Sequence, residues 1–157
     1  MTAADAAVAI CEKHLTDTKS LNTEVETYLV KYLLVLICSE FEEMVLRTVE
    51  ARASNSPDTE IVTFIKSATL QLFRSLRIGE LAGLLARFAP AVKAGFSANV
   101  NNTAAHAAFD TIINNRMQVA HTTGVVNLTF GELKLRYEES KIVVRHFAAA
   151  LNVPHPC

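Results

Sequence analysis

The longest helical pattern in the sequence runs from about residue 24 to residue 53. Apolar residues recur along it at spacings of three and four, which places them on one face of an α-helix. Such a helix is about 45 Å long at 1.5 Å per residue, so the remaining segments must fold against one long rod. The residues of this apolar stripe are Val25, Tyr28, Leu29, Tyr32, Leu33, Leu36, Ile37, Phe41, Met44, Val45 and Val49.

The other segments also show helical spacing, and none alternates with period two over five or more residues. Two capping-box patterns, Thr23 with Glu26 and Thr129 with Glu132, mark helix starts because each pairs a hydroxyl with a carboxylate three residues later. We therefore predict an all-α fold, an up-and-down four-helix bundle with a short N-terminal helix and a broken helix in the long connection. Besides 24–53, the expected helices cover residues 3–15, 57–76, 80–88, 91–96, a segment ending near 121, and 130–151.

A turn and a loop separate some of the expected helices. Ser56 precedes Pro57, which fits the first position of a helix because its missing N–H needs no partner there, so Ser56 is the expected N-cap. Residues 97–103 contain three Asn and are expected to form a loop. The chain is expected to be a single domain, residues 1–157 with its core at about 24–151, since this length suffices for one hydrophobic core.

The composition sets limits on partners and location. The formal net charge of -1 gives no overall field toward nucleic acid or an anionic membrane, so contact with RNA would need a local patch. Cys11, Cys38 and Cys157 are far apart without a CxxC pair, which favours a reducing compartment over a disulfide framework or a zinc site. The N-terminus lacks the basic region of a signal peptide, and the longest apolar run, residues 28–38, is too short to span a bilayer. We expect a soluble, cytoplasmic protein with no membrane contact.

Two charged residues interrupt the apolar faces of the expected helices. Glu40 falls on the buried side of the helix at 24–53, four residues after Leu36. Arg116 falls in the middle of the apolar stripe of the helix that ends near residue 121. Because isolated buried charges are strongly disfavoured, we expect Glu40 and Arg116 to meet inside the bundle as an ion pair.

His121 follows Arg116 by five residues, just before the helix-breaking segment Thr122-Thr123-Gly124. Histidine is the side chain best suited to moving protons near neutral pH. Positions five apart on an ideal helix differ by about 140° in direction. Arg116 and His121 therefore converge only if the helix ends or distorts near His121. Alternatively, a second copy of the chain brings its own pair into the same cleft. The alternative is a histidine that interacts favourably with the dipole at a helix C-terminus.

The Arg-x4-His spacing of Arg116 and His121, in the penultimate long helix of an all-α chain, resembles the signature of the HEPN superfamily, in particular its RiboL-PSP-type group. The Ala-His-Thr-Thr-Gly segment at 120–124 and Glu40 in the long early helix are similar to the family as well. The resemblance covers most of residues 24–151. It implies a homodimeric, metal-independent endoribonuclease without a cofactor. Arg116 would bind the phosphate, His121 would act as general acid or base, and Glu40 would orient Arg116. The activity implies RNA as substrate. Such proteins act as toxins or in phage defence, and that role implies a cognate antitoxin or regulatory protein as partner.

Met117 departs from the family pattern, because active members usually carry Asn, Asp or His directly after the arginine. A thioether makes no comparable polar contact to a substrate, so Asn114, Asn115 or Gln118 would have to supply it. The alternative hypothesis is a non-catalytic HEPN-type module for dimerisation or interaction. A third is an unrelated helical bundle in which Arg116 is purely structural.

One polar face of the Arg116 helix carries His106, Asp110, Asn114 and His121. His106 and Asp110, four apart, have a spacing that metal ligands use, although paired polar residues on a solvated face explain them equally well. We assign no metal site.

The last expected helix carries Lys134, Lys141 and Arg145 along one side. This side either contributes a patch that follows phosphate groups or, with the interleaved Glu138 and Glu139, forms an ordinary solvated face. The solvated face is the preferred interpretation.

Overall fold

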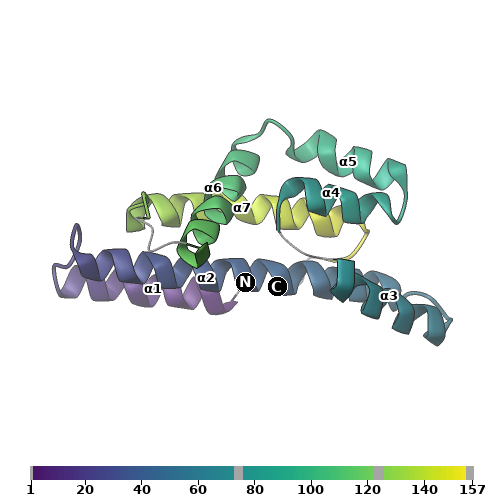
Figure 1. The fold of residues 1–157 in the computed structure, drawn as a ribbon, viewed down its shortest axis with the longest axis horizontal. Coiled ribbons are helices and arrows are strands. Elements are labelled where there is room, and N and C mark those ends of the chain that lie inside the picture. Colours follow the sequence, from purple (N-terminus) through teal and green to yellow (C-terminus); the bar gives the residue numbers. More distant parts are fainter. Residues whose placement is uncertain (1, 73–75, 122–125, 155–157) are drawn as a thin grey trace.

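The structure is a computed structural model that describes residues 2–72, 76–121 and 126–154 (Figure 1). Of Thr2, Leu72 and His121 it describes the backbone alone. Seven helices and no strand occur in these ranges, which confirms the all-α class. The helices are α1 (Thr2–Asp17), α2 (Glu24–Ala53), α3 (Thr59–Leu72), α4 (Ile78–Ala86), α5 (Pro90–Val100), α6 (Ala104–His121) and α7 (Phe130–Ala150).

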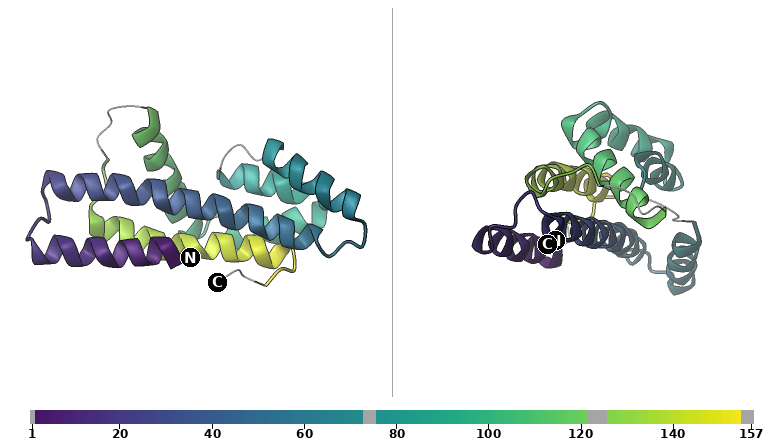
Figure 2. Two further views of the ribbon diagram at one scale, coloured as in Figure 1. Left: turned by 90° about the horizontal axis from the view of Figure 1, so that it is seen from below. Right: turned by 60° about the vertical axis from the view of Figure 1, so that its left-hand side comes forward.

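The long helix α2 is the element around which the others are arranged. It contacts α1, α3, α6 and α7, and α7 in turn contacts α5 and α6. Figures 1 and 2 show α1, α2 and α7 running lengthwise together, whereas α6 is steeply inclined to them. The ring of Phe41 on α2 stacks on Phe109 of α6 at 5.5 Å between centroids and lies 6.0 Å from Tyr137 of α7. These three buried rings fix α6, the helix of the predicted site, against the middle of α2.

The predicted apolar stripe of α2 is buried in its central and C-terminal part and exposed near its start. Leu33 and Phe41 are fully buried, as predicted. Val25, Tyr28 and Tyr32 are 42%, 68% and 55% exposed, so the predicted burial of these three is wrong. The reason is that the apolar side chains of α2 occupy a larger part of its circumference than the neighbouring helices cover.

The two predicted capping boxes have different outcomes. At the start of α7 the Thr129 hydroxyl accepts from the Glu132 N–H at 3.2 Å and the Glu132 carboxylate accepts from the Thr129 N–H at 2.9 Å, so this box is confirmed. At the start of α2 the Thr23 side chain makes no capping hydrogen bond. Glu26, which is 6% exposed, instead accepts a 2.6 Å hydrogen bond from the Phe130 N–H of α7 and another from the Asn22 N–H. The long-range hydrogen bond to Phe130 thus takes the place of the predicted capping box.

Helix α3 starts later than predicted. The Asp58 carboxylate accepts from the N–H groups of Glu60 at 2.9 Å and Ile61 at 3.1 Å, so Asp58 caps α3 and the predicted cap at Ser56 is wrong. A carboxylate can accept hydrogen bonds from two of the unsatisfied N–H groups of the first turn. Its negative charge also interacts favourably with the positive end of the helix dipole.

Helix α5 extends through most of the loop predicted at residues 97–103. Phe96 and Val100, four residues apart and therefore on one face, are both buried. Their burial holds the helical backbone over a segment whose Asn residues favour turns.

Polar contacts with α7 attach the N-terminal helix. Lys141, only 7% exposed, lies 2.7 Å from the Asp5 carboxylate, which also accepts a 3.0 Å hydrogen bond from the Tyr137 hydroxyl. Lys134 lies 2.7 Å from Glu12. Lys134 and Lys141, two of the three basic residues considered for a phosphate patch, thus contact α1 instead. Because Lys141 is buried, this side of α7 is not an ordinary solvated face at that residue.

We expect this attachment to weaken in acid. Burial raises the pKa of Asp5, but the hydrogen bonds from Lys141 and Tyr137 outweigh it and leave that pKa below its usual value. A carboxyl group whose pKa is lowered in the folded protein contributes its full stability at pH values above the ordinary carboxyl pKa of about 3.9. This contribution is lost as the pH falls through the lowered pKa. Asp5→Asn should therefore cost about 1 kcal/mol at pH 7, a modest value because the Asp5 side chain is 46% exposed. It should also flatten the fall in stability from about pH 5 to pH 2. Urea unfolding across this range measures both, with the exposed Asp17→Asn on α1 as control; parallel profiles would contradict the assignment.

Candidate functional site

Arg116 lies on the side of α6 that faces α2. Its side chain is half-buried and close enough to Cys38 of α2 to favour the thiolate electrostatically. It forms no ion pair with any residue in the described ranges. The guanidinium is therefore a partly exposed cation without a carboxylate partner among these residues, which leaves it free to bind an anion.

Glu40 does not meet Arg116, contrary to the expected ion pair. Its carboxylate accepts hydrogen bonds from the backbone N–H groups of Ala3 at 3.3 Å and Ala4 at 3.0 Å, in the first turn of α1. The carboxylate is satisfied by N–H groups that have no partner within their own helix. Glu40 is half-buried and attaches α1 to α2, and in this structure it does not orient Arg116.

The residues on either side of Arg116 have separate partners. The Asn115 amide donates to the Thr111 carbonyl one turn earlier at 2.8 Å, whereas Asn114 is exposed. Met117 packs against the hydrophobic core, and its sulfur accepts from an Arg77 nitrogen at 3.5 Å. Met117 therefore connects α6 to the start of α4, which gives this residue a structural explanation.

His121 is the last residue of α6, and its side chain lies outside the described part of the structure, as do Thr122-Thr123-Gly124. Helix α6 is α-helical from Ala104 through His121. On a continuous helix, positions 116 and 121 differ by about 140° in direction. The backbone positions of Arg116 and His121 therefore lie on different sides of α6, which ends at His121.

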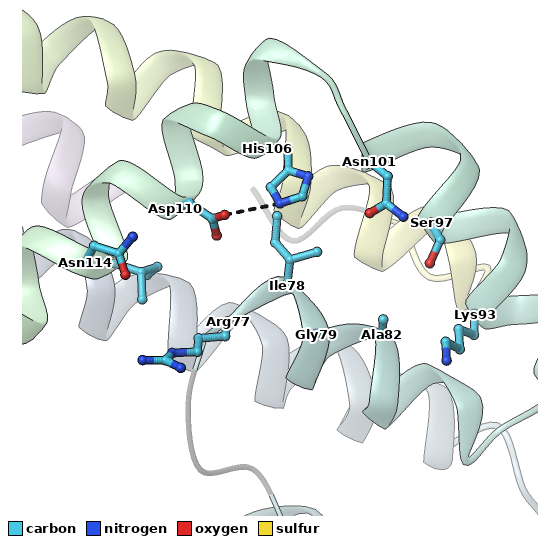
Figure 3. A pocket seen from close by; sticks show the side chains of 11 residues that line it. Arg77, Ile78, Gly79, Ala82, Lys93, Ser97, Asn101, His106, Asp110 and Asn114 are labelled. Carbon is cyan, nitrogen blue, oxygen red and sulfur yellow. Dashed lines mark ion pairs between the residues drawn. The ribbon is translucent and has the colours of Figure 1, made fainter.

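A polar pocket of about 590 Å³ lies between α4, α5 and α6 (Figure 3). The predicted polar face of α6 forms one wall, where His106 Nε2 lies 3.2 Å from the Asp110 Oδ2 and Asn114 stands one turn further on. Arg77, immediately before α4, and Lys93 on α5 complete the charged residues of the lining. The sequence pattern did not indicate Arg77 and Lys93, because they come from separate elements and share no spacing with the residues of α6.

His106 and Asp110 thus pair with each other at the pocket wall. No group of three or more His, Cys, Asp or Glu side chains that could hold a metal ion occurs among the described residues. Within the same ranges no helix is both long and apolar enough to cross a membrane.

Cys38 beside Arg116 is expected to be unreactive in the folded protein. The thiol is 1% exposed, and burial raises its pKa to about 12 even though the Arg116 charge opposes the shift. Because the thiolate is the reactive form, iodoacetamide at pH 8 should leave Cys38 unmodified in native protein and modify it fully in urea. Peptide mass spectrometry measures both states. Rapid native labelling at Cys38 would contradict the packing of α2 against α6.

No family model, curated protein or solved structure matches this chain.

Proposed function

We propose that the protein is a HEPN-like, metal-independent endoribonuclease built on an up-and-down four-helix bundle. The observation that carries the proposal is the half-buried Arg116 on α6, which has no carboxylate partner in the described chain. An arginine paired with Glu40 would have been neutralised, whereas this guanidinium is available for a phosphate.

The proposed reaction uses the two residue types of the motif. One His121 imidazole takes the proton of the RNA 2′-hydroxyl as that oxygen attacks phosphorus, and the bond from phosphorus to the 5′ oxygen breaks. The imidazolium of the same His121 then supplies the proton to the leaving 5′ oxygen. Arg116 binds the phosphate and stabilises the charge that develops on its oxygens in the transition state. None of these steps requires a metal ion.

The positions of these residues on α6 support a homodimer. Since positions 116 and 121 stand on different sides of a continuous helix, the proposed site combines Arg116 of one copy with His121 of the other. The exposed side chains of Val25, Tyr28 and Tyr32 on α2 provide apolar surface for association of two copies. We place the enzyme in the cytoplasm as a toxin or defence component, controlled by a cognate regulatory protein.

The second candidate is a non-catalytic interaction module of the same kind. The observation that favours it is the contact of Met117 with Arg77, because it gives the residue after Arg116 a packing role in place of a substrate contact. RNA cleavage in excess EDTA by purified protein of known solution mass separates the two candidates. Cleavage supports the enzyme, and a folded dimer that leaves RNA intact supports the module.

A further inference from the structure

The pocket between α4, α5 and α6 has an excess of positive charge. Two cationic side chains, Arg77 and Lys93, and one carboxylate, that of Asp110, line it, and the carboxylate lies 3.2 Å from His106 Nε2. Arg77 and Lys93 form no ion pair with any described carboxylate. In a chain whose formal net charge is -1, two unneutralised cations on one concave surface are a local departure that favours an anionic ligand.

The two cations stand at opposite ends of the pocket. Figure 3 shows Arg77 at one end and Lys93 at the other, with the His106–Asp110 pair on the wall between them. The Asn101 amide and the Ser97 hydroxyl line the same space from α5 and the residue that follows it. A ligand that fills this pocket would meet a positive charge at each end and hydrogen-bonding groups along its middle.

We propose that this pocket binds a polyhydroxylated compound with an acidic group at each end, the chemistry of a sugar bisphosphate. Arg77 and Lys93 would each bind one phosphate, and the ligand hydroxyls would exchange hydrogen bonds with Asn101, Ser97 and the His106–Asp110 pair. The volume of about 590 Å³ lies within the range of small-molecule sites and leaves room for a six-carbon compound with two phosphates. This site is separate from Arg116 and does not depend on the proposed RNA cleavage.

Calorimetric titration with three matched sugars tests the proposal. Fructose 1,6-bisphosphate should bind saturably with one site per chain, fructose 6-phosphate should bind at least about tenfold more weakly, and fructose should not bind. The ratio follows because the monophosphate leaves one cation without an anion. Absence of saturable binding to folded protein, or equal affinity for the bisphosphate and the monophosphate, would overturn the proposal.

Charge-neutralising variants assign the binding to the pocket. Arg77→Gln and Lys93→Gln should each weaken binding of the bisphosphate at least about tenfold, whereas Lys13→Gln on the exposed side of α1 should leave it unchanged. Binding that falls equally in all three variants would indicate non-specific attraction and overturn the site. RNA cleavage is measured separately, so its absence would not bear on this result.

Two glycines of α4 provide a steric test that leaves the charges in place. Gly79 lines the pocket and Gly83 does not, and a Cβ added at either one meets no atom within 4 Å. Both Gly79→Leu and Gly83→Leu should fold, since leucine favours a helix more than glycine does. Only Gly79→Leu should weaken binding of the bisphosphate. Unchanged binding by a folded Gly79→Leu variant would place the ligand elsewhere and contradict the proposal.

Discussion

His121→Ala is expected to lower RNA cleavage in excess EDTA by about 10²-fold to 10⁴-fold, the range typical of a lost general acid or base. The stability of the variant should stay within about 0.5 kcal/mol of the wild type, because position 121 is the last residue of α6. Cleavage of a fluorescent single-stranded RNA measures the first quantity and urea unfolding the second. Equal cleavage by the variant and the wild type would remove His121 from the mechanism.

Arg116→Ala should reduce cleavage in the same assay while leaving the fold intact. Because Arg116 has no carboxylate partner among the described residues, its removal strands no buried charge. Arg145→Ala, at an exposed arginine of α7, is the matched control and should retain full activity. A loss of several kcal/mol in Arg116→Ala would instead favour an unrelated bundle in which the arginine is structural.

Mixing the two inactive variants tests the shared site directly. If each site combines Arg116 of one copy with His121 of the other, a dimer of Arg116→Ala with His121→Ala retains one intact site. Random exchange of subunits should then restore about one quarter of wild-type activity, since half of the dimers are mixed and each has one of two sites. No recovery after verified exchange would mean that both residues act within one chain. A folded wild-type dimer that never cleaves RNA would favour the interaction module.

Periodicity predicted the helices of this fold well, and local patterns predicted its contacts less well. The bounds of α2 and α7 follow from apolar spacing and, in α7, from a capping box whose two partners are only three residues apart. Glu26 shows the limit of such patterns. Its carboxylate contacts Phe130, 104 residues further along the chain, and that proximity exists only after α7 has packed against α2.

The candidate site shows the same division. The sequence placed His106, Asp110 and Asn114 on one polar face of α6, and the structure puts all three at one pocket. Arg77 and Lys93 could not be assigned to that pocket, because their position depends on the angle between α4, α5 and α6. The expected meeting of Glu40 with Arg116 failed for a related reason, since the start of α1 competes for the carboxylate.

Glu26→Ala is expected to destabilise the protein by about 2–3 kcal/mol, the range for lost hydrogen bonds to a charged group. The Glu26 side chain accepts from the Phe130 N–H at 2.6 Å and from the N–H of Asn22, a residue held at φ 60° in the turn between α1 and α2. Removing the carboxylate leaves both donors without this acceptor, and the bond to Phe130 is buried. Urea unfolding measures the loss, and faster hydrogen exchange at the Phe130 amide should accompany it.

Two variants separate this contact from a general effect of charge. Glu26→Gln keeps one carbonyl oxygen as an acceptor and should cost roughly half as much as Glu26→Ala, about 1–1.5 kcal/mol. Glu24→Ala removes an exposed carboxylate in the same first turn of α2 and should stay within about 0.5 kcal/mol. If Glu26→Ala were no more costly than Glu24→Ala, the start of α7 would have to be held by its own capping box and by packing alone. The long-range hydrogen bond would then contribute nothing to the stability of the fold.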